Sequence, residues 1–521
     1  MLTPFVIGLI GHRELVSGEL PKLQEAFDNY LEKILDSLKF TPVLVLTSVA
    51  EGADRLAHKS RFRSRIQICS ILPLDINEYV KDFKGREKRV EFQSIIEDSE
   101  FVIALARNKI IKKPSITERN KSYRDCALWI CDNANSLYAV WDGKSARGIG
   151  GTADTVKYRM RTMGTNSHIE GGIQLIHQLA SNGSITPLEE CKCTGHNKFS
   201  KVDLKHLKDF DQLNSYLSNS TVDVNSSSLE SHFELLDKEA ITLQKQFLMG
   251  TKSLLFLGVL SVNMAAIQME SPTPAFLYPT VLLFTLTMLF WSRQSKSQIK
   301  VAYETFRLMA EVLRVQIWWN SCGIKGRVLD EITELREMGG PVSLFLSNTF
   351  LIQEITSWRL TNTKKGNLEP IEWIEGQKSY LRSGKSKGAI KKNEDKAKFQ
   401  KRLIFFFIAL AGSSILLGAY ATSLFDDNAD ELVQNITSIL FTASLSLAAA
   451  VAAFTQVMSY REVLRRYLIK ELRLDNSILL MRTSNTRIER LKIAKEIGRD
   501  SLSEAFRWYQ VKSERQVRPF Q

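Results

Sequence analysis

Glycine-rich and polar sequences follow several apolar runs in the first third of the chain. The last of these sequences covers residues 148–154 and reads GIGGTAD. Glycines let a backbone approach a phosphate closely, and a helix that begins near Thr152 would direct its N–H groups at an anion. Arg13 could add charge-assisted hydrogen bonds, while Glu51 or Asp142 could accept one from a ribose hydroxyl. These residue types predict a cleft for a nucleotide-like ligand.

The elements that would position these residues alternate between strands and helices. The expected strands cover residues 5–10, 42–47, 66–72, 101–106 and 137–141, and the helices between them cover 20–38, 54–63, 90–97 and 119–134. Nearly continuous Val/Ile/Leu strands separated by helices predict a parallel sheet covered on both faces. Ligands of such sheets lie beyond the carboxyl ends of the strands. Tight strand-to-helix turns would explain one glycine cluster, whereas four polar strand ends on one edge favour a ligand.

Four motifs follow one another at these strand ends: GHR, SVAEGADRLA, LPLDINEYVKDF and AVWDGKSARGIGGTADTVKY. In this order they resemble the SLOG superfamily, which is related to LOG and DprA proteins, over about residues 3–180. The resemblance implies a Rossmann-like domain that binds a nucleotide or a nucleotide-derived ligand. With Asp142 added from the argument above, the candidate ligand-binding residues are Gly11, His12, Arg13, Ser48, Glu51, Gly52, Asp54, Asp142, Gly150, Gly151 and Thr152.

One position departs from the enzymatic members of that superfamily. LOG-type phosphoribohydrolases carry a glutamate three residues after the threonine of a GGxGTxxE motif. In this chain Thr155 stands at that position, and Asp154 comes one residue earlier. Because no carboxylate is available there for acid–base chemistry, we expect a sensor with no catalytic residues. The alternative is a membrane-tethered nucleotide or nucleoside hydrolase that uses Glu51, Asp54 or Asp142.

Four long stretches without Asp, Glu, Lys or Arg lie between residues 253 and 460, in two close pairs. Each reaches or approaches the roughly 20 apolar residues that cross a hydrocarbon core of about 30 Å. The expected transmembrane helices cover about residues 253–270, 274–292, 403–425 and 433–458. The sequence therefore predicts an all-α membrane domain with two hairpins and cytosolic amphipathic helices.

The net charge of +13 fits this topology and needs no nucleic-acid partner. Lys and Arg cluster just outside each apolar pair, whereas the connections at 270–274 and 426–431 contain neither. By the positive-inside rule both connections face outward and the remainder is cytoplasmic. We also find no pattern of a cleavable signal peptide at the start of the chain. We therefore expect a multi-pass protein of the inner membrane with both termini in the cytoplasm.

An amphipathic helix follows each hairpin, which indicates a tandem repeat. The first begins at Tyr303 and carries Phe306, Met309 and Leu313 on one face, and the second begins at Tyr460. The modules would cover residues 235–382 and 395–515, after a nucleotide-binding domain at 1–180 and a polar segment and linker at 181–234.

The sequence VAYETFRLMAEVLRVQIWWNSCGI, in the first module, resembles the SLATT class of two-transmembrane effector modules. The resemblance covers residues 235–515 and is weaker in the second module. SLATT modules occur beside SLOG domains and nucleotide-synthesising enzymes in prokaryotic conflict systems. The resemblance implies an effector that permeabilises the membrane when its cytosolic domain receives a signal.

A mildly polar face runs along the fourth apolar stretch, where Ser438, Thr442 and Ser446 recur every four residues. These side chains are candidates for a pore lining, and close helix packing is the alternative. A pore would require a homo-oligomer, because four helices enclose little space. Cys191 and Cys193 beside His196 lack a second ligand pair for zinc, so we predict no metal site.

The expected function is that of a membrane effector in prokaryotic antiphage immunity. It would sense a nucleotide-derived second messenger through its SLOG domain and form a pore in the inner membrane. The messenger acts as a ligand in place of a cofactor. A TIR enzyme or a nucleotide cyclase would produce it. A membrane-anchored binding module without a pore is the remaining alternative.

Overall fold

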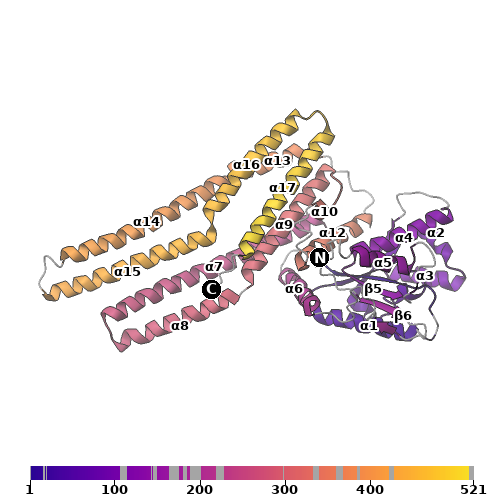
Figure 1. The fold of residues 1–521 in the computed structure, drawn as a ribbon, viewed down its shortest axis with the longest axis horizontal. Helices are drawn as coiled ribbons and strands as arrows, with labels where there is room; N and C mark the ends of the chain where they lie inside the picture. Colours follow the sequence, from indigo (N-terminus) through magenta and orange to yellow (C-terminus); the bar gives the residue numbers. More distant parts are fainter. Residues whose placement is uncertain are drawn as a thin grey trace.

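The protein has an α/β domain that is joined to a long helical part (Figure 1). The computed structural model describes residues 2–15, 18, 20–105, 114–141, 144, 150–162, 175–179, 185–187, 201–218, 228–296, 298–331, 340–359, 368–383, 388–421 and 427–514.

The α/β domain is built on a seven-stranded sheet in the order β4-β3-β2-β1-β5-β6-β7. The strands are β1 Phe5–Gly11, β2 Val43–Thr47, β3 Ile66–Leu72, β4 Phe101–Ala104, β5 Ser136–Trp141, β6 Leu175–Leu179 and β7 Ile185–Pro187. Strands β1 to β5 pair only in parallel, as does β5 with β6, and β7 is antiparallel to β6. The predicted parallel sheet is confirmed, and the sequence did not reveal β6 and β7.

Helices cover both faces of the sheet. Phe5, Ile7 and Leu9 of β1 point toward α1 (Leu20–Ser37) and α6 (Lys201–Ser218). Val6 and Ile10 point the other way, toward α4 (Ile116–Asn133) and α5 (Thr152–Thr162). Because both faces of β1 are buried, its sequence is a continuous apolar run without polar alternation. The short α2 (Ile76–Tyr79) and α3 (Arg86–Asp98) complete the domain beside β3 and β4.

The helix expected at residues 54–63 is wrong. The chain forms a short 3-10 turn, η1 (Gly52–Arg55), then successive tight turns and a second 3-10 turn, η2 (Arg63–Arg65). The side chain of Asp28 in α1 accepts hydrogen bonds from the Ser60 hydroxyl at 2.5 Å and from the Arg61 N–H at 3.5 Å. These tertiary contacts hold donors in positions that a continuous helix would not provide.

Ten helices of the described residues form the second part. They are α7 Leu229–Glu270, α8 Pro274–Lys296, α9 Ile299–Cys322, α10 Val328–Glu331, α12 Gly340–Arg359, α13 Pro370–Arg382, α14 Ala389–Ala421, α15 Asp427–Met458, α16 Tyr460–Thr483 and α17 Arg487–Glu514. By length and composition, four helical spans beginning in α7, α8, α14 and α15 can cross a membrane. Their large apolar side chains are widely exposed. This pattern is that of a membrane protein.

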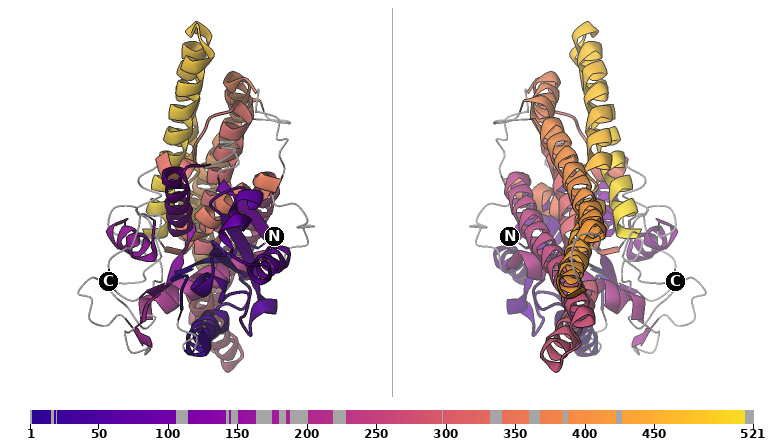
Figure 2. Two further views of the ribbon diagram at one scale, coloured as in Figure 1. Left: turned by 90° about the vertical axis from the view of Figure 1, so that its right-hand side faces the viewer. Right: turned by 90° about the vertical axis from the view of Figure 1, so that its left-hand side faces the viewer.

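The two membrane hairpins share one order of elements. In each, a long helix that extends beyond the apolar stretch is followed by its hairpin partner and then by a returning helix. The returning helix packs on the extension, as α9 does on α7 and α16 does on α14. Helix α15 also packs on α7, so the hairpins lie side by side (Figures 1 and 2).

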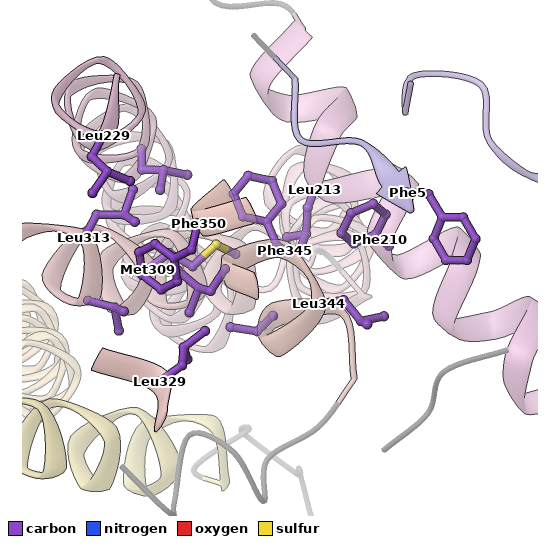
Figure 3. Close-up of a cluster of buried hydrophobic side chains, with 14 of the residues drawn as sticks. Phe5, Phe210, Leu213, Leu229, Met309, Leu313, Leu329, Leu344, Phe345 and Phe350 are labelled. Carbon is purple, nitrogen blue, oxygen red and sulfur yellow. The ribbon is translucent and has the colours of Figure 1, made fainter. Parts of the chain in front are cut away.

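Helix α12 joins the helical part to the sheet. It follows the first hairpin in the sequence, yet Phe345 of α12 packs on Phe210 of α6, which packs on Phe5 of β1. The same apolar cluster includes Met309 and Leu313 of α9 (Figure 3). One continuous core therefore runs from the sheet to the helix that packs on the first hairpin.

A buried amide pair fixes this contact. Asn348 of α12 and Asn135, just before β5, each donate a side-chain N–H to the other's side-chain oxygen, at 2.7 and 3.0 Å. Asn348 also donates to the Pro4 carbonyl at 2.8 Å, and Asn135 exchanges two hydrogen bonds with the Val6 backbone. Beside them, the Thr349 and Thr3 hydroxyls lie 3.1 Å apart. All these side chains are buried, so each polar atom depends on its partner.

Replacing Asn348 with Ala should destabilise the protein by about 2–3 kcal/mol, because it leaves the buried Asn135 amide and the Pro4 carbonyl without a partner. Thermal unfolding of the purified chain in detergent measures this loss. Ser357→Ala, on the exposed face of the same helix, is the control and should change stability by less than about 0.5 kcal/mol. Equal melting temperatures for the two variants would contradict the assigned role of the amide pair.

Candidate functional site

The strand order reverses between β1 and β5. From β1 the chain adds β2, β3 and β4 on one side, and it then returns to place β5 and β6 on the other. At such a reversal the connections leave in opposite directions and open a crevice beyond the carboxyl ends of the strands. The residues that follow β1, β2 and β5 therefore meet at one edge of the sheet.

The turn after β1 lies directly on the turn after β2. The His12 N–H donates to the Val140 carbonyl at 3.2 Å, and the His12 carbonyl accepts from the Ala53 N–H at 3.1 Å. A methyl group at Gly11 would lie within 3.0 Å of Ala53. Gly52 has a φ of +86°, and a methyl group there would collide with the carbonyls of His12 and Arg13. Only glycines allow the two turns to approach this closely.

A buried carboxyl group lies beneath these turns. The Ser48 hydroxyl donates to Oδ2 of Asp54, whereas Oδ1 is buried without a hydrogen-bond partner in the described part of the chain. Burial raises the pKa of Asp54 to about 6, and the Ser48 hydrogen bond and the charge of Arg13 limit this rise. Asp54 therefore changes its charge close to neutral pH, and its free oxygen can accept a hydrogen bond from a ligand.

The loop after β2 is strained at a residue that the sequence did not single out. Val49 has a φ of +60°, a conformation that a β-branched side chain rarely adopts. Its side chain is fully buried, and its N–H donates to the Thr47 hydroxyl at 3.3 Å. Packing thus holds a backbone geometry that is unfavourable locally, as is common in ligand-binding loops. No pattern in the sequence signals a positive φ at a valine.

Helix α4 lines the same edge with side chains that we did not predict. The guanidinium of Arg13, an exposed side chain, lies 5.1 Å from the ring centre of Tyr123. The hydroxyl of Tyr123 and the guanidinium of Arg119 both bind the carboxylate of Asp82. A methyl group at Gly150 would collide with the backbone of Arg124. The glycine turn before α5 and the turn after β1 therefore lie on neighbouring residues of one helix.

The N-terminus of α5 already carries a negative charge. The Gly150 N–H donates to Asp154 at 3.3 Å, and the buried Thr155 hydroxyl donates to the Gly151 carbonyl at 3.1 Å. Thr155 therefore supports the helix end, and its position offers no carboxylate. Among the described residues, the only carboxylate at this helix end is that of Asp154, so a phosphate here would have to displace it or accept a neighbouring position.

The other predicted ligand-binding residues differ in their placement. Gly11, His12, Arg13, Ser48, Gly52 and Asp54 are in mutual contact, and Gly150, Gly151 and Thr152 lie across α4 from them. Glu51 pairs with Lys88 of α3 at 2.5 Å, so its carboxylate is held by α3. Asp142 lies outside the described residues.

Comparison of the chain with protein-family models, with curated proteins and with solved structures found no match. The geometry of the chain itself must therefore support any functional assignment.

A separate cavity of about 700 Å³ lies beside α3. Its lining residues are His58, Lys59, Arg86, Glu87, Val90, Glu91, Ser94, Ile95 and Asp98. His58 donates or accepts through Nδ1 at 2.9 Å from Asp98, and burial lowers the pKa of its imidazole. Charges of both signs surround this cavity, so it indicates no class of ligand. Within the described residues no cluster of His, Cys, Asp and Glu could hold a metal, and Cys191, Cys193 and His196 lie outside them.

The pore-lining candidates lie between the two hairpins. The Ser438 hydroxyl of α15 donates to Glu270 at the end of α7 at 2.7 Å, and Ser446 accepts from Asn263 of α7 at 3.0 Å. Thr442 lies between them and is partly buried. Within one chain, Ser438 and Ser446 therefore hold α15 against α7.

Replacing Gly52 with Ala should destabilise the α/β domain by about 2–4 kcal/mol, because the added methyl group meets two carbonyl oxygens. Gly85→Ala is a matched control: its φ of +91° carries the same backbone cost, yet nothing lies within 4 Å of the added methyl group. Chemical denaturation followed by fluorescence compares the two. If both variants lose the same stability, the contact between the turns is not the reason for glycine at position 52.

Asp54 predicts a pH dependence of stability. The pKa of this carboxyl is about 6 in the folded state and near its usual 3.8 when unfolded, so the folded state binds the additional proton between these values. Stability should therefore fall as pH rises from 4 to 6, by on the order of 3 kcal/mol. Asp54→Asn should abolish this decrease, whereas the exposed Asp36→Asn should retain it. Unfolding free energies across this pH range decide the outcome.

Proposed function

We propose that this protein is a ligand-gated membrane effector. A nucleotide-derived signal binds the cleft at the ends of β1, β2 and β5, and its binding opens a pore formed by several copies of the membrane hairpins. The resemblance to SLOG and SLATT proteins supports a Rossmann-like domain and a role in antiphage defence at the inner membrane. A TIR enzyme or a nucleotide cyclase would supply the signal.

The observation that carries this proposal is the Asn135–Asn348 contact. Asn135 begins β5, whose other end lies at the cleft, and Asn348 belongs to α12, which shares a core with α9. Helix α9 in turn packs on α7, the first helix of the first hairpin. A shift of β5 on ligand binding would therefore reach the membrane through packed elements and a buried polar pair.

The chemistry of the cleft favours a ligand with both anionic and hydrogen-bond-donating groups. Arg13 is exposed at the rim and can bind a phosphate, while Asp54 below has a free oxygen that can accept from a hydroxyl or an amino group. A nucleotide or an ADP-ribose derivative presents both kinds of group.

A ligand gates the pore only by binding the open state better. Moving a population from 1:99 to 99:1 requires about 5.5 kcal/mol of differential affinity. Several copies in one assembly can supply this energy jointly, which supports a homo-oligomer.

A nucleotide or nucleoside hydrolase is the second candidate, because the pKa of Asp54, about 6, suits a general acid or base. Its weakness is that the nearest position of the LOG-type glutamate is Thr155, whose hydroxyl is bound to Gly151.

The test uses the full chain in dye-filled liposomes, with a mononucleotide, an ADP-ribose derivative and a cyclic oligonucleotide added separately. One of them should release the dye, and Arg13→Ala should raise the concentration required by at least tenfold, because it removes a charge-assisted contact worth about 1.5–3 kcal/mol. Calorimetry measures binding in parallel, and chromatography detects turnover.

Arg65→Ala is the control, since this exposed arginine precedes β3 at the opposite edge of the sheet. Binding without dye release would overturn the gating proposal. Consumption of the bound compound would favour the hydrolase.

A further inference from the structure

Helix α16 exposes an apolar stripe although it lies outside the membrane-spanning stretches. Leu468, Ile469, Leu472, Leu479 and Leu480 keep between 41% and 65% of their surface exposed. The opposite face, with Leu474, Ile478 and Met481, is buried and packs on α13 and α14. At about 1.5 Å per residue, the stripe begins about 12 Å and ends about 30 Å along the helix from Tyr460, where the membrane stretch stops. It therefore extends away from the lipid.

The stripe has the spacing of a coiled-coil seam. Ile469, Leu472, Asn476 and Leu479 follow one another at intervals of three, four and three residues. In heptad terms Ile469 and Asn476 occupy a positions, and Leu472 and Leu479 occupy d positions. Isoleucine at a with leucine at d favours two parallel strands, and a single asparagine at a fixes the register and the number of strands. Asn476 is exposed in the isolated chain, where such an asparagine serves no packing purpose.

The first module shows that this face of the returning helix is normally covered. When Tyr303 of α9 is aligned with Tyr460 of α16, Ile469 corresponds to Val312, and Leu472 corresponds to Val315. Both valines are fully buried. Helix α17 covers the a-position side of this face.

Two contacts place α17 there, one heptad on either side of Val312. The hydroxyls of Thr305 and Tyr509 lie 3.5 Å apart, and a methyl group at Gly498 would collide with Trp319. Within the described residues, α16 has no equivalent of α17 on its own stripe.

We propose that this stripe pairs with α16 of a second copy of the chain to form a parallel two-stranded coiled coil. Two copies inserted in one membrane have the same orientation, so a two-fold axis normal to the membrane makes their α16 helices parallel. The pairing extends the proposed homo-oligomer by naming the surface that joins two copies, and it exists before any ligand binds.

The exposed area is sufficient for this role. Five half-exposed aliphatic side chains present roughly 400–500 Å² of apolar surface, so the pair buries about 800–1,000 Å² from them alone. Asn476 and the flanking side chains bring the total toward the ~1,200 Å² of a specific interface. Arg465, one turn before Ile469, ends the seam on the membrane side.

Cysteine cross-linking of the full chain in native membranes tests the pairing. Leu472→Cys and Leu479→Cys, introduced singly, should each form a disulfide-linked dimer under mild oxidation, because equivalent d positions face each other in a parallel pair. The wild-type chain controls for its six native cysteines. Asp500→Cys, on the exposed side of α17, controls for random collision.

A second variant pair measures the strength of the contact. Leu472→Glu combined with Leu479→Glu should lower the dimer fraction in lipid nanodiscs at least tenfold, because it places charges at the centre of the seam. Ile488→Glu changes an equally exposed aliphatic residue outside the seam, so it should leave the dimer intact. Unchanged melting temperatures ensure that the charged variants are folded.

Three outcomes would overturn the pairing: no cross-link above wild type at either position, equal cross-linking at position 500, or a cross-link to a different protein. Cross-linking at only one of the two d positions would also overturn it, since it indicates antiparallel helices. Dye release is measured separately. A dimer that binds a nucleotide without releasing dye would sink the proposed function and leave the pairing intact.

Discussion

The buried amide pair of Asn135 and Asn348 is the contact on which the architecture depends. It ties the start of β5 to a helix that comes more than 200 residues later, after the first membrane hairpin. Two primary amides in an apolar interior satisfy each other only in one relative position, so the pair fixes register as well as proximity. The surrounding core, from Phe5 through Phe345 to Leu313, provides the attraction, and the amides select a single arrangement.

The position of this contact determines what the α/β domain can report. Strands β1 and β5 carry the cleft at their carboxyl ends and contact α12 at their amino ends. The strained Val49, the buried Asp54 and the two glycine turns concentrate local strain and polarity at the cleft end. A ligand that relaxes or reshapes this end acts on strands whose other end is clamped to the helical part.

The two membrane modules are alike in order and unlike in burial. Helix α9 is enclosed by α7, α12 and α17, whereas α16 is covered on one face only. Duplication of a hairpin with its returning helix would produce two equivalent faces, and this chain has a single α17 to cover them. The uncovered face carries leucine, isoleucine and one asparagine, a composition that suits a second helix better than water.

The sequence by itself determined the strands β1 to β5, the glycine-rich edge and the four apolar helices. Continuous apolar runs and uninterrupted 20-residue stretches are local signals, and charge on one side of each hairpin orients them. The tertiary structure alone decided that residues 54–63 form turns bound to Asp28, that Val49 adopts a positive φ, and that Ser438 and Ser446 face α7. It also decided that α12 returns to the sheet, because a hydrogen bond between residues 135 and 348 depends on distance in space and leaves no periodic trace in the chain.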